Sequence, residues 1–155
     1  MKKPCAVDVS AIQKQITGEF GPWGKELEIT QERINRFADV TEDHQWVHVD
    51  VERANKPKRE GLFRGTIAHG FLTLSLIPAL LPEIVGFGGT STINHAGKYA
   101  FVNPVPSGSR VHARMRLISA KQTGERKVII EAEVEVALAG TDKVVLTATL
   151  QFAVF

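Results

Sequence analysis

Apolar and polar residues alternate along the last third of the chain with a period of two. The alternation runs through residues 111–117, 128–138 and 146–154, and Thr123-Gly124 and Gly140-Thr141 separate these segments with residues typical of turns. Because a period of two places every second side chain on one face, the pattern predicts three long strands with one apolar face. We expect two more strands, a short one near residues 27–29 and another at residues 93–102.

Helical periodicity appears earlier in the chain. Thr30 has the position of a helix N-cap, because Ile34, Phe37 and Ala38 follow it at helical spacing. Residues 51–54 fit one more helical turn. Residues 69–81 are apolar nearly all round, which predicts a buried helix that Pro78 kinks or ends early. The apolar face of the sheet needs a cover, so we expect an α+β fold in which the sheet wraps around this helix.

Length and composition then narrow the class of protein. A chain of 155 residues has the size of one domain, and the glycine-rich stretch before residue 25 suggests an N-terminal arm (residues 1–25) leading into a single domain (residues 26–155). A net charge of +2 does not indicate a nucleic-acid partner, and the single Cys5 allows no internal disulfide. The apolar run at residues 67–81 is too short to span a membrane. We therefore expect a soluble, cytoplasmic protein.

The residues with reactive side chains gather in two stretches. Residues 41–50 contain two histidines and three acids, and Asp43 and His48 lie close enough in sequence to meet if the chain turns between them. A carboxylate and an imidazole can then hold one water molecule, which is the minimum for general acid–base catalysis. The alternative interpretation is a polar junction between a helix and a loop, whose acids are simply solvated.

The second stretch, residues 65–72, has a glycine where the buried helix is expected to begin. Gly70 would present a free backbone N–H at the positive end of the helix dipole, where it could stabilise an oxyanion. The alternative is a glycine that is required only for close packing.

Together the two stretches resemble the MaoC-like dehydratases, the (R)-specific enoyl-CoA hydratases of the hotdog superfamily. The usual signature is Asp-x-Asn-Pro-x-His, followed by Ala/Val-His-Gly-Met/Phe-Leu; here Asp43 and His48 match the first element and residues 68–72 match the second. Gln45-Trp46 replaces Asn-Pro, as is common in the nodulation-protein-N branch. The resemblance covers residues 20–155. Ala100 stands where that branch often has an arginine, and Pro78 stands where some relatives have a serine.

The resemblance implies a hotdog fold, with a curved antiparallel sheet around a long central helix, and a homodimer formed edge to edge. It implies reversible hydration of a trans-2-enoyl-CoA to a (3R)-3-hydroxyacyl-CoA without a metal or redox cofactor. Asp43 and His48 would share the water, and the Gly70 N–H would hold the thioester oxygen. Two alternatives are a hotdog acyl-CoA thioesterase and a non-catalytic acyl-CoA-binding protein.

The remaining candidate residues concern substrate binding. His69 is expected to cap the central helix and to line the substrate site, whereas His44 is expected to point away from Asp43. His95 and His112 are expected on strand surfaces. The phosphates of CoA require cations, and the loop between the two stretches offers Lys56, Lys58, Arg59 and Arg64. The basic face made by Arg110, Arg114 and Arg116 could serve equally well.

Overall fold

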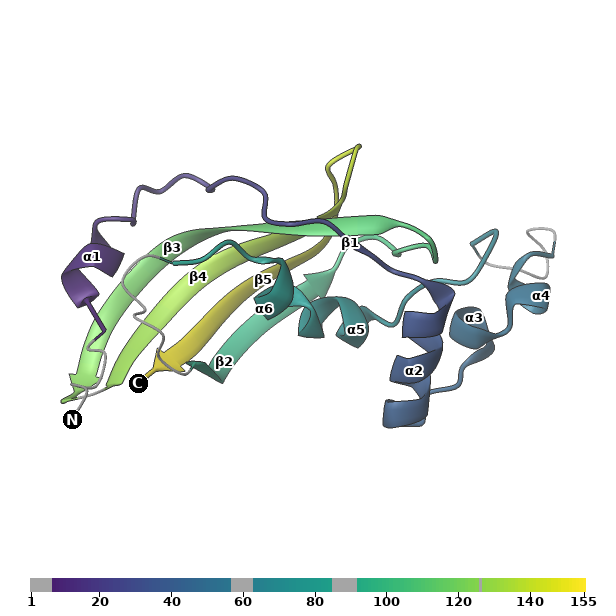
Figure 1. Ribbon diagram of the computed structural model, residues 1–155, viewed down its shortest axis with the longest axis horizontal. Helices are drawn as coiled ribbons and strands as arrows, with labels where there is room; N and C mark the ends of the chain where they lie inside the picture. The colour runs from purple at the N-terminus through teal and green to yellow at the C-terminus, as the bar shows by residue number, and fades with distance from the viewer. Residues whose placement is uncertain (1–6, 57–62, 85–91, 126) are drawn as a thin grey trace, which may run out of the picture.

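A five-stranded antiparallel sheet forms the body of the protein, with the strand order β1-β3-β4-β5-β2 (Figure 1). The computed structural model describes residues 7–56, 63–84, 92–125 and 127–155. The predicted strands are confirmed, and most of them extend beyond the alternating segments. The strands are β1 (Leu27–Glu28), β2 (Thr92–Phe101), β3 (Arg110–Gly124), β4 (Lys127–Leu138) and β5 (Lys143–Val154).

The alternation of apolar and polar residues produces the two faces of this sheet. On β4, Ile130, Ala132 and Val134 are almost fully buried, and burial of a Val or Ile side chain contributes about 1.5–3 kcal/mol to folding. The intervening Glu133 and Glu135 point to the other face, where they form ion pairs with Arg116 and Arg114 of β3. One face of the sheet therefore supplies the core, and the other is a ladder of paired charges.

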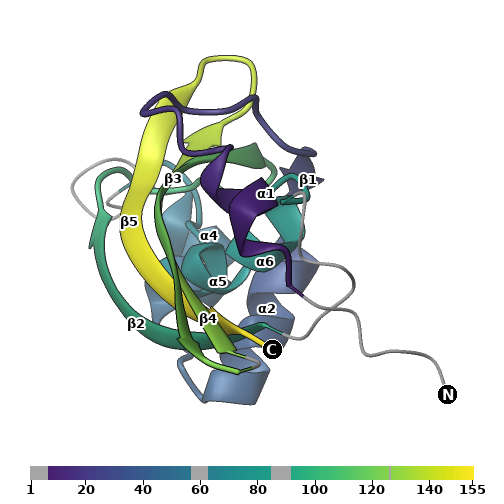
Figure 2. The same cartoon turned by 90° about the vertical axis from the view of Figure 1, so that its left-hand side faces the viewer.

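The segment predicted as one buried helix forms two short helices, α5 (Gly70–Ser75) and α6 (Ile77–Leu80). Both lie inside the curve of the sheet, as expected (Figure 2). The break falls at Leu76, two residues before Pro78, which has no N–H for a continuous helix. Leu72, Ile77 and Leu80 are buried, but Phe71 is 55% exposed, so the helix is covered on one face only.

Three helices lie together at one end of the molecule (Figure 1): α2 (Gln31–Thr41), α3 (Trp46–Val49) and α4 (Val51–Ala54). The Thr30 hydroxyl caps α2 by accepting a hydrogen bond from Arg33 N, 3.1 Å away, as its position in the sequence predicts. Asp50 caps α4 in the same way through Arg53 N. The two caps fix where α2 and α4 begin.

The chain before β1 lies along β3. It begins with α1 (Val9–Gln13), in which Ile12 is fully buried, and Gly24 N then donates to Ala113 O across 2.7 Å. Trp23 stacks on the ring of His112, with 4.0 Å between the ring centroids. His112 is therefore buried and not on the strand surface, because the arm covers this part of β3. The exposed position of His95 on β2 is confirmed.

Within the described residues, none of the helices combines the length and the apolar character needed to cross a membrane.

Candidate active site

His48 lies in the single turn of α3 and is 91% buried, at 9% exposure. Its Nδ1 lies 2.8 Å from the carbonyl oxygen of Ile67, in the segment that leads into α5. A carbonyl oxygen can only accept, so Nδ1 carries a hydrogen and donates it to Ile67 O. Nε2 is therefore the nitrogen of His48 that remains for a water molecule or a substrate.

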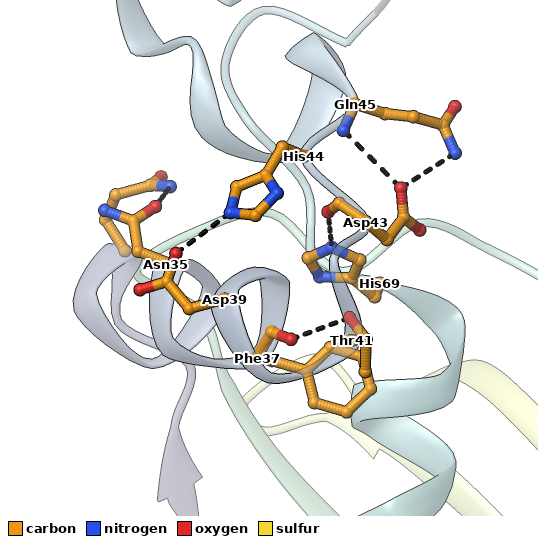
Figure 3. Close-up of polar contacts among 9 residues, drawn as sticks. Asn35, Phe37, Asp39, Thr41, Asp43, His44, Gln45 and His69 are labelled. Carbon is orange, nitrogen blue, oxygen red and sulfur yellow. Dashed lines mark hydrogen bonds and ion pairs between the residues drawn. The ribbon is translucent and has the colours of Figure 1, made fainter.

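His69 immediately precedes α5 and lies against His48. The two rings stack with 3.8 Å between their centroids, and the ring of Phe37 contacts His69 at 5.0 Å. His69 Nε2 donates to the backbone oxygen of Asp43 across 2.9 Å (Figure 3). Among the described residues no hydrogen-bond partner reaches its buried Nδ1. Burial lowers the pKa of His69, so the ring stays neutral and its Nδ1 offers a lone pair.

Asp43 lies in the short connection between α2 and α3. Glu42 ends α2 with a left-handed backbone, φ 60°, which turns the chain so that Asp43 faces the histidines. The carboxylate accepts from the Gln45 side chain across 3.1 Å and from Gln45 N across 3.4 Å (Figure 3). The side-chain bond lowers the pKa of Asp43, because it stabilises the charged form. The turn predicted between Asp43 and His48 is present.

Asp43, His48 and His69 bring their ligand atoms within 4.8 Å of one another, and in the described part of the chain they are the group that could hold a metal ion. A zinc ion needs lone pairs that converge on one point about 2.0–2.2 Å away. The two imidazoles are stacked with only 25° between their planes, so their lone pairs lie in two nearly parallel planes. This arrangement suits a small polar molecule held between the groups better than a zinc ion.

Gly70 is the first residue of α5, so its N–H has no partner within the helix. The ring of Phe101 on β2 lies beside it; a Cβ at this position would be 2.9 Å from two atoms of that ring. The close-packing alternative for this glycine therefore has a structural basis. It is compatible with a role for the N–H, because the backbone N–H is present whatever the reason for the missing side chain.

The remaining predicted residues are His44 and the cations of the loop between the two motifs. His44 Nε2 lies 2.9 Å from the Asp39 carboxylate, which raises the pKa of His44, and its ring points away from the Asp43 carboxylate (Figure 3). Lys58 and Arg59 lie outside the described residues, while Lys56 and Arg64 are exposed on either side of them.

The alternative basic face on β3 is occupied by ion pairs. Arg110 pairs with Glu26, and Arg114 and Arg116 pair with carboxylates of β4. Arg114 and Arg116 also lie over aromatic rings of the N-terminal arm. A phosphate that bound here would compete with carboxylates already paired to these guanidinium groups.

Sequence reasoning missed two residues beside the site, Gln31 and Thr66. The Gln31 amide donates to the backbone oxygen of His48 across 2.8 Å and accepts from the Thr66 hydroxyl. Neither residue belongs to a recognisable motif, and they are separated by 35 positions. Only the tertiary structure brings them together.

Comparison with known proteins agrees with this fold. Residues 15–139 match the family model described as "MaoC like domain". The chain is 44% identical over 117 residues to 3-hydroxyacyl-thioester dehydratase Z of Mycobacterium tuberculosis, covering 74% of this chain and 75% of that protein. It is 35% identical over 150 residues to nodulation protein N of Rhizobium meliloti, covering 92% and 88%.

Among solved structures, the (R)-hydratase of A. caviae involved in PHA biosynthesis superposes with a TM-score of 0.65 at 20% identity, covering 85% of this chain and 96% of that one. The curled antiparallel sheet with helices in its concavity is thus the hotdog fold. The chain belongs to the MaoC-like dehydratase family.

Proposed function

We propose that this protein is an (R)-specific enoyl-CoA hydratase, a hydro-lyase that adds water reversibly to a trans-2-enoyl-CoA and gives a (3R)-3-hydroxyacyl-CoA. The observation that carries the proposal is the convergence of the Asp43 carboxylate with the ring nitrogens of His48 and His69, all within 4.8 Å. Family membership supports it. So does the relative named for the dehydration of 3-hydroxyacyl thioesters, which is the reverse direction of the same reaction.

In this proposal one water molecule lies between Asp43 and His48. His48 Nε2 accepts one hydrogen of the water, and the Asp43 carboxylate, which is ionised at neutral pH, accepts the other. The water oxygen bonds to C3 of the substrate. The proton taken from the water is returned to C2, so that H and OH add across the double bond.

Negative charge moves onto the thioester oxygen as the bond to C3 forms. The N–H of Gly70, free at the start of α5, donates to this oxygen. His69 lines the same space and keeps it dry on one side, because its ring fills the gap between His48 and Phe37. The groups that activate water and the group that stabilises the enolate thus lie on adjacent segments.

The proposal is tested by hydration of crotonyl-CoA, followed through the loss of enoyl absorbance. We expect Asp43→Asn and His48→Ala each to lower kcat by about 10²–10⁴-fold, the usual contribution of an acid–base group. His44→Ala is the matched control, since the ring of His44 pairs with Asp39, away from the Asp43 carboxylate. Unchanged hydration by both active-site variants would refute the assignment.

The same samples separate the two alternative functions. A thioesterase would release free CoA, which a thiol reagent detects, whereas a hydratase leaves the thioester intact. A non-catalytic binder would bind CoA esters with no turnover, and its binding would be indifferent to Asp43→Asn.

Two partner proposals accompany the reaction. Lys56, Lys58, Arg59 and Arg64 bind the phosphates of CoA, because the loop between the two motifs gathers four cations in a short segment. The protein forms a homodimer through β2, since every residue of this edge strand is exposed in the single chain. An exposed edge offers unpaired N–H and C=O groups to a second strand.

A further inference from the structure

The side chain of Gln31 joins three segments that meet at the active site. Its Nε2 donates to the backbone oxygen of His48 across 2.8 Å, and its Oε1 accepts from the hydroxyl of Thr66. Gln31 is the first residue of α2, whose start is fixed by the Thr30 cap. A rigid helix end is therefore tied at once to α3 and to the segment before α5.

Thr66 is adjacent to the residue that orients the His48 ring. Ile67 O accepts from His48 Nδ1 across 2.8 Å, and Ile67 N donates to Val47 O across 3.1 Å. Thr66 is only 4% exposed, so in the folded protein its hydroxyl depends on Gln31 for this hydrogen bond. The contacts of Gln31, Thr66 and Ile67 form a closed ring around the His48 backbone and imidazole.

A four-residue helix cannot hold a catalytic ring in place by its own hydrogen bonds. We propose that Gln31 and Thr66 are positioning residues that hold the backbone of His48, and through Ile67 O its imidazole, in the orientation that aims Nε2 at the substrate water. This inference rests on the proposed hydratase function. Neither side chain touches the reacting atoms in this scheme.

The chemistry at residue 31 is specific to an amide. The position needs a donor toward the His48 carbonyl and an acceptor toward the Thr66 hydroxyl, which one amide supplies in a fixed geometry. A glutamate of the same shape keeps the acceptor but turns the donor into a second acceptor facing a carbonyl oxygen. Gln31→Glu therefore breaks the contact with His48 and retains the contact with Thr66.

The kinetic test compares Gln31→Glu, Thr66→Val and Thr66→Ser in the full chain. We expect Gln31→Glu and Thr66→Val to lower kcat for crotonyl-CoA by about 10–100-fold with KM changed by less than about twofold, since small displacements of a catalytic group cost rate more than binding. Thr66→Ser keeps the hydroxyl and should keep most of the activity. Asn35→Ala is the control, because it removes only the exposed hydrogen bond between Gln31 Nε2 and Asn35.

Three kinetic outcomes overturn the inference. The first is wild-type kcat in Gln31→Glu and Thr66→Val. The second is a loss of activity in Thr66→Ser equal to that in Thr66→Val. The third is a loss in every variant that follows the drop in melting temperature, which would indicate a merely structural role.

A second measurement separates failure of this inference from failure of the proposed reaction. In protein labelled with ¹⁵N-histidine, NMR reports which nitrogen of His48 carries the hydrogen. We expect the Nδ1–H form in the wild type and in Asn35→Ala, and a mixture of both tautomers in Gln31→Glu. If the wild type hydrates no enoyl-CoA, the reaction is refuted; identical His48 signals in wild type and Gln31→Glu refute the positioning role, whatever the activity.

Discussion

Two stacked imidazoles can share a site only if they do not both carry a charge. His69 is kept neutral because burial lowers its pKa, and the Nδ1–H of His48 is held by the Ile67 carbonyl. The ring nitrogens that remain for a bound molecule are therefore His48 Nε2 and His69 Nδ1, beside the Asp43 carboxylate. Protonation of His69 is the change at this site that follows most directly from pH.

The lowered pKa of His69 predicts how stability depends on pH. Its folded pKa lies below the ordinary value of 6.5, so the unfolded chain binds more protons as the pH falls below 6.5. The contribution of neutral His69 to the free energy of unfolding is therefore complete above pH 6.5. It is lost as the pH falls through the folded pKa of His69. Urea unfolding at several pH values should show the free energy of unfolding falling with pH below 6.5 in the wild type. The fall should be smaller in His69→Gln, which keeps a donor for Asp43 O.

His44 provides the contrast. The hydrogen bond to Asp39 raises the pKa of His44. The contribution of this pair to the free energy of unfolding is therefore present below pH 6.5 and is lost as the pH rises through the folded pKa of His44. His44→Ala should thus steepen the loss of stability at low pH, whereas His69→Gln reduces it. Equal slopes in both variants would contradict the assignment of opposite shifts.

At the scale of the elements, strands were predictable because their alternation persists over many residues. Each of β3, β4 and β5 contains its predicted segment, and each strand pairs with its neighbour along most of its length. A core face that must stay buried fixes the register, since a shift by one residue would expose every apolar side chain. For these strands the local sequence pattern and the tertiary packing therefore favour the same secondary structure and the same register.

Elements whose environment depends on distant segments were predicted less well. The continuous apolar pattern at residues 69–81 gave no sign that Phe71 would be exposed, because exposure depends on what β2 leaves uncovered. His112 was misplaced since the covering Trp23 lies almost 90 residues earlier in the chain. For the candidate site, two local motifs pointed to Asp43, His48 and Gly70, whose catalytic roles stay predictions, whereas no local pattern pointed to Gln31 and Thr66.

The loop between the two motifs carries a prediction of its own. The triple variant Lys56→Ala, Lys58→Ala, Arg59→Ala should raise KM for crotonyl-CoA with little change in kcat, because phosphate binding lies away from the reacting carbons. The KM of the wild type should also rise with salt more steeply than that of the variant, as charge pairing at an exposed surface is screened. Arg110→Ala, which breaks an exposed ion pair with Glu26, serves as the control. An unaltered KM in the triple variant would refute the loop as the CoA-binding segment.

At the scale of the whole molecule, the single chain leaves an apolar surface uncovered. Phe71 of α5 contacts Tyr99 and Phe101 of β2 through edge-on rings, and all three side chains are 45–55% exposed. Ile93, on the same edge strand, is 58% exposed. A cluster of exposed aromatics next to a free strand edge is typical of a surface that another chain covers. A second copy fits, since a two-fold axis lets the same edge pair with itself.

The homodimer is therefore expected to depend on β2. Sedimentation equilibrium should give twice the mass of the chain for the wild type, and the mass of one chain for Ile93→Lys and Tyr99→Lys, because a lysine on an edge strand blocks pairing with another edge. Val40→Lys is the matched control: Val40 is 84% exposed but lies on α2, apart from the aromatic cluster, and this variant should remain dimeric. A monomeric wild type would refute the dimer, and dimeric Ile93→Lys and Tyr99→Lys would place the interface elsewhere. Circular dichroism of both strand variants checks that a loss of mass reflects the interface, since the core face of the sheet contains neither residue.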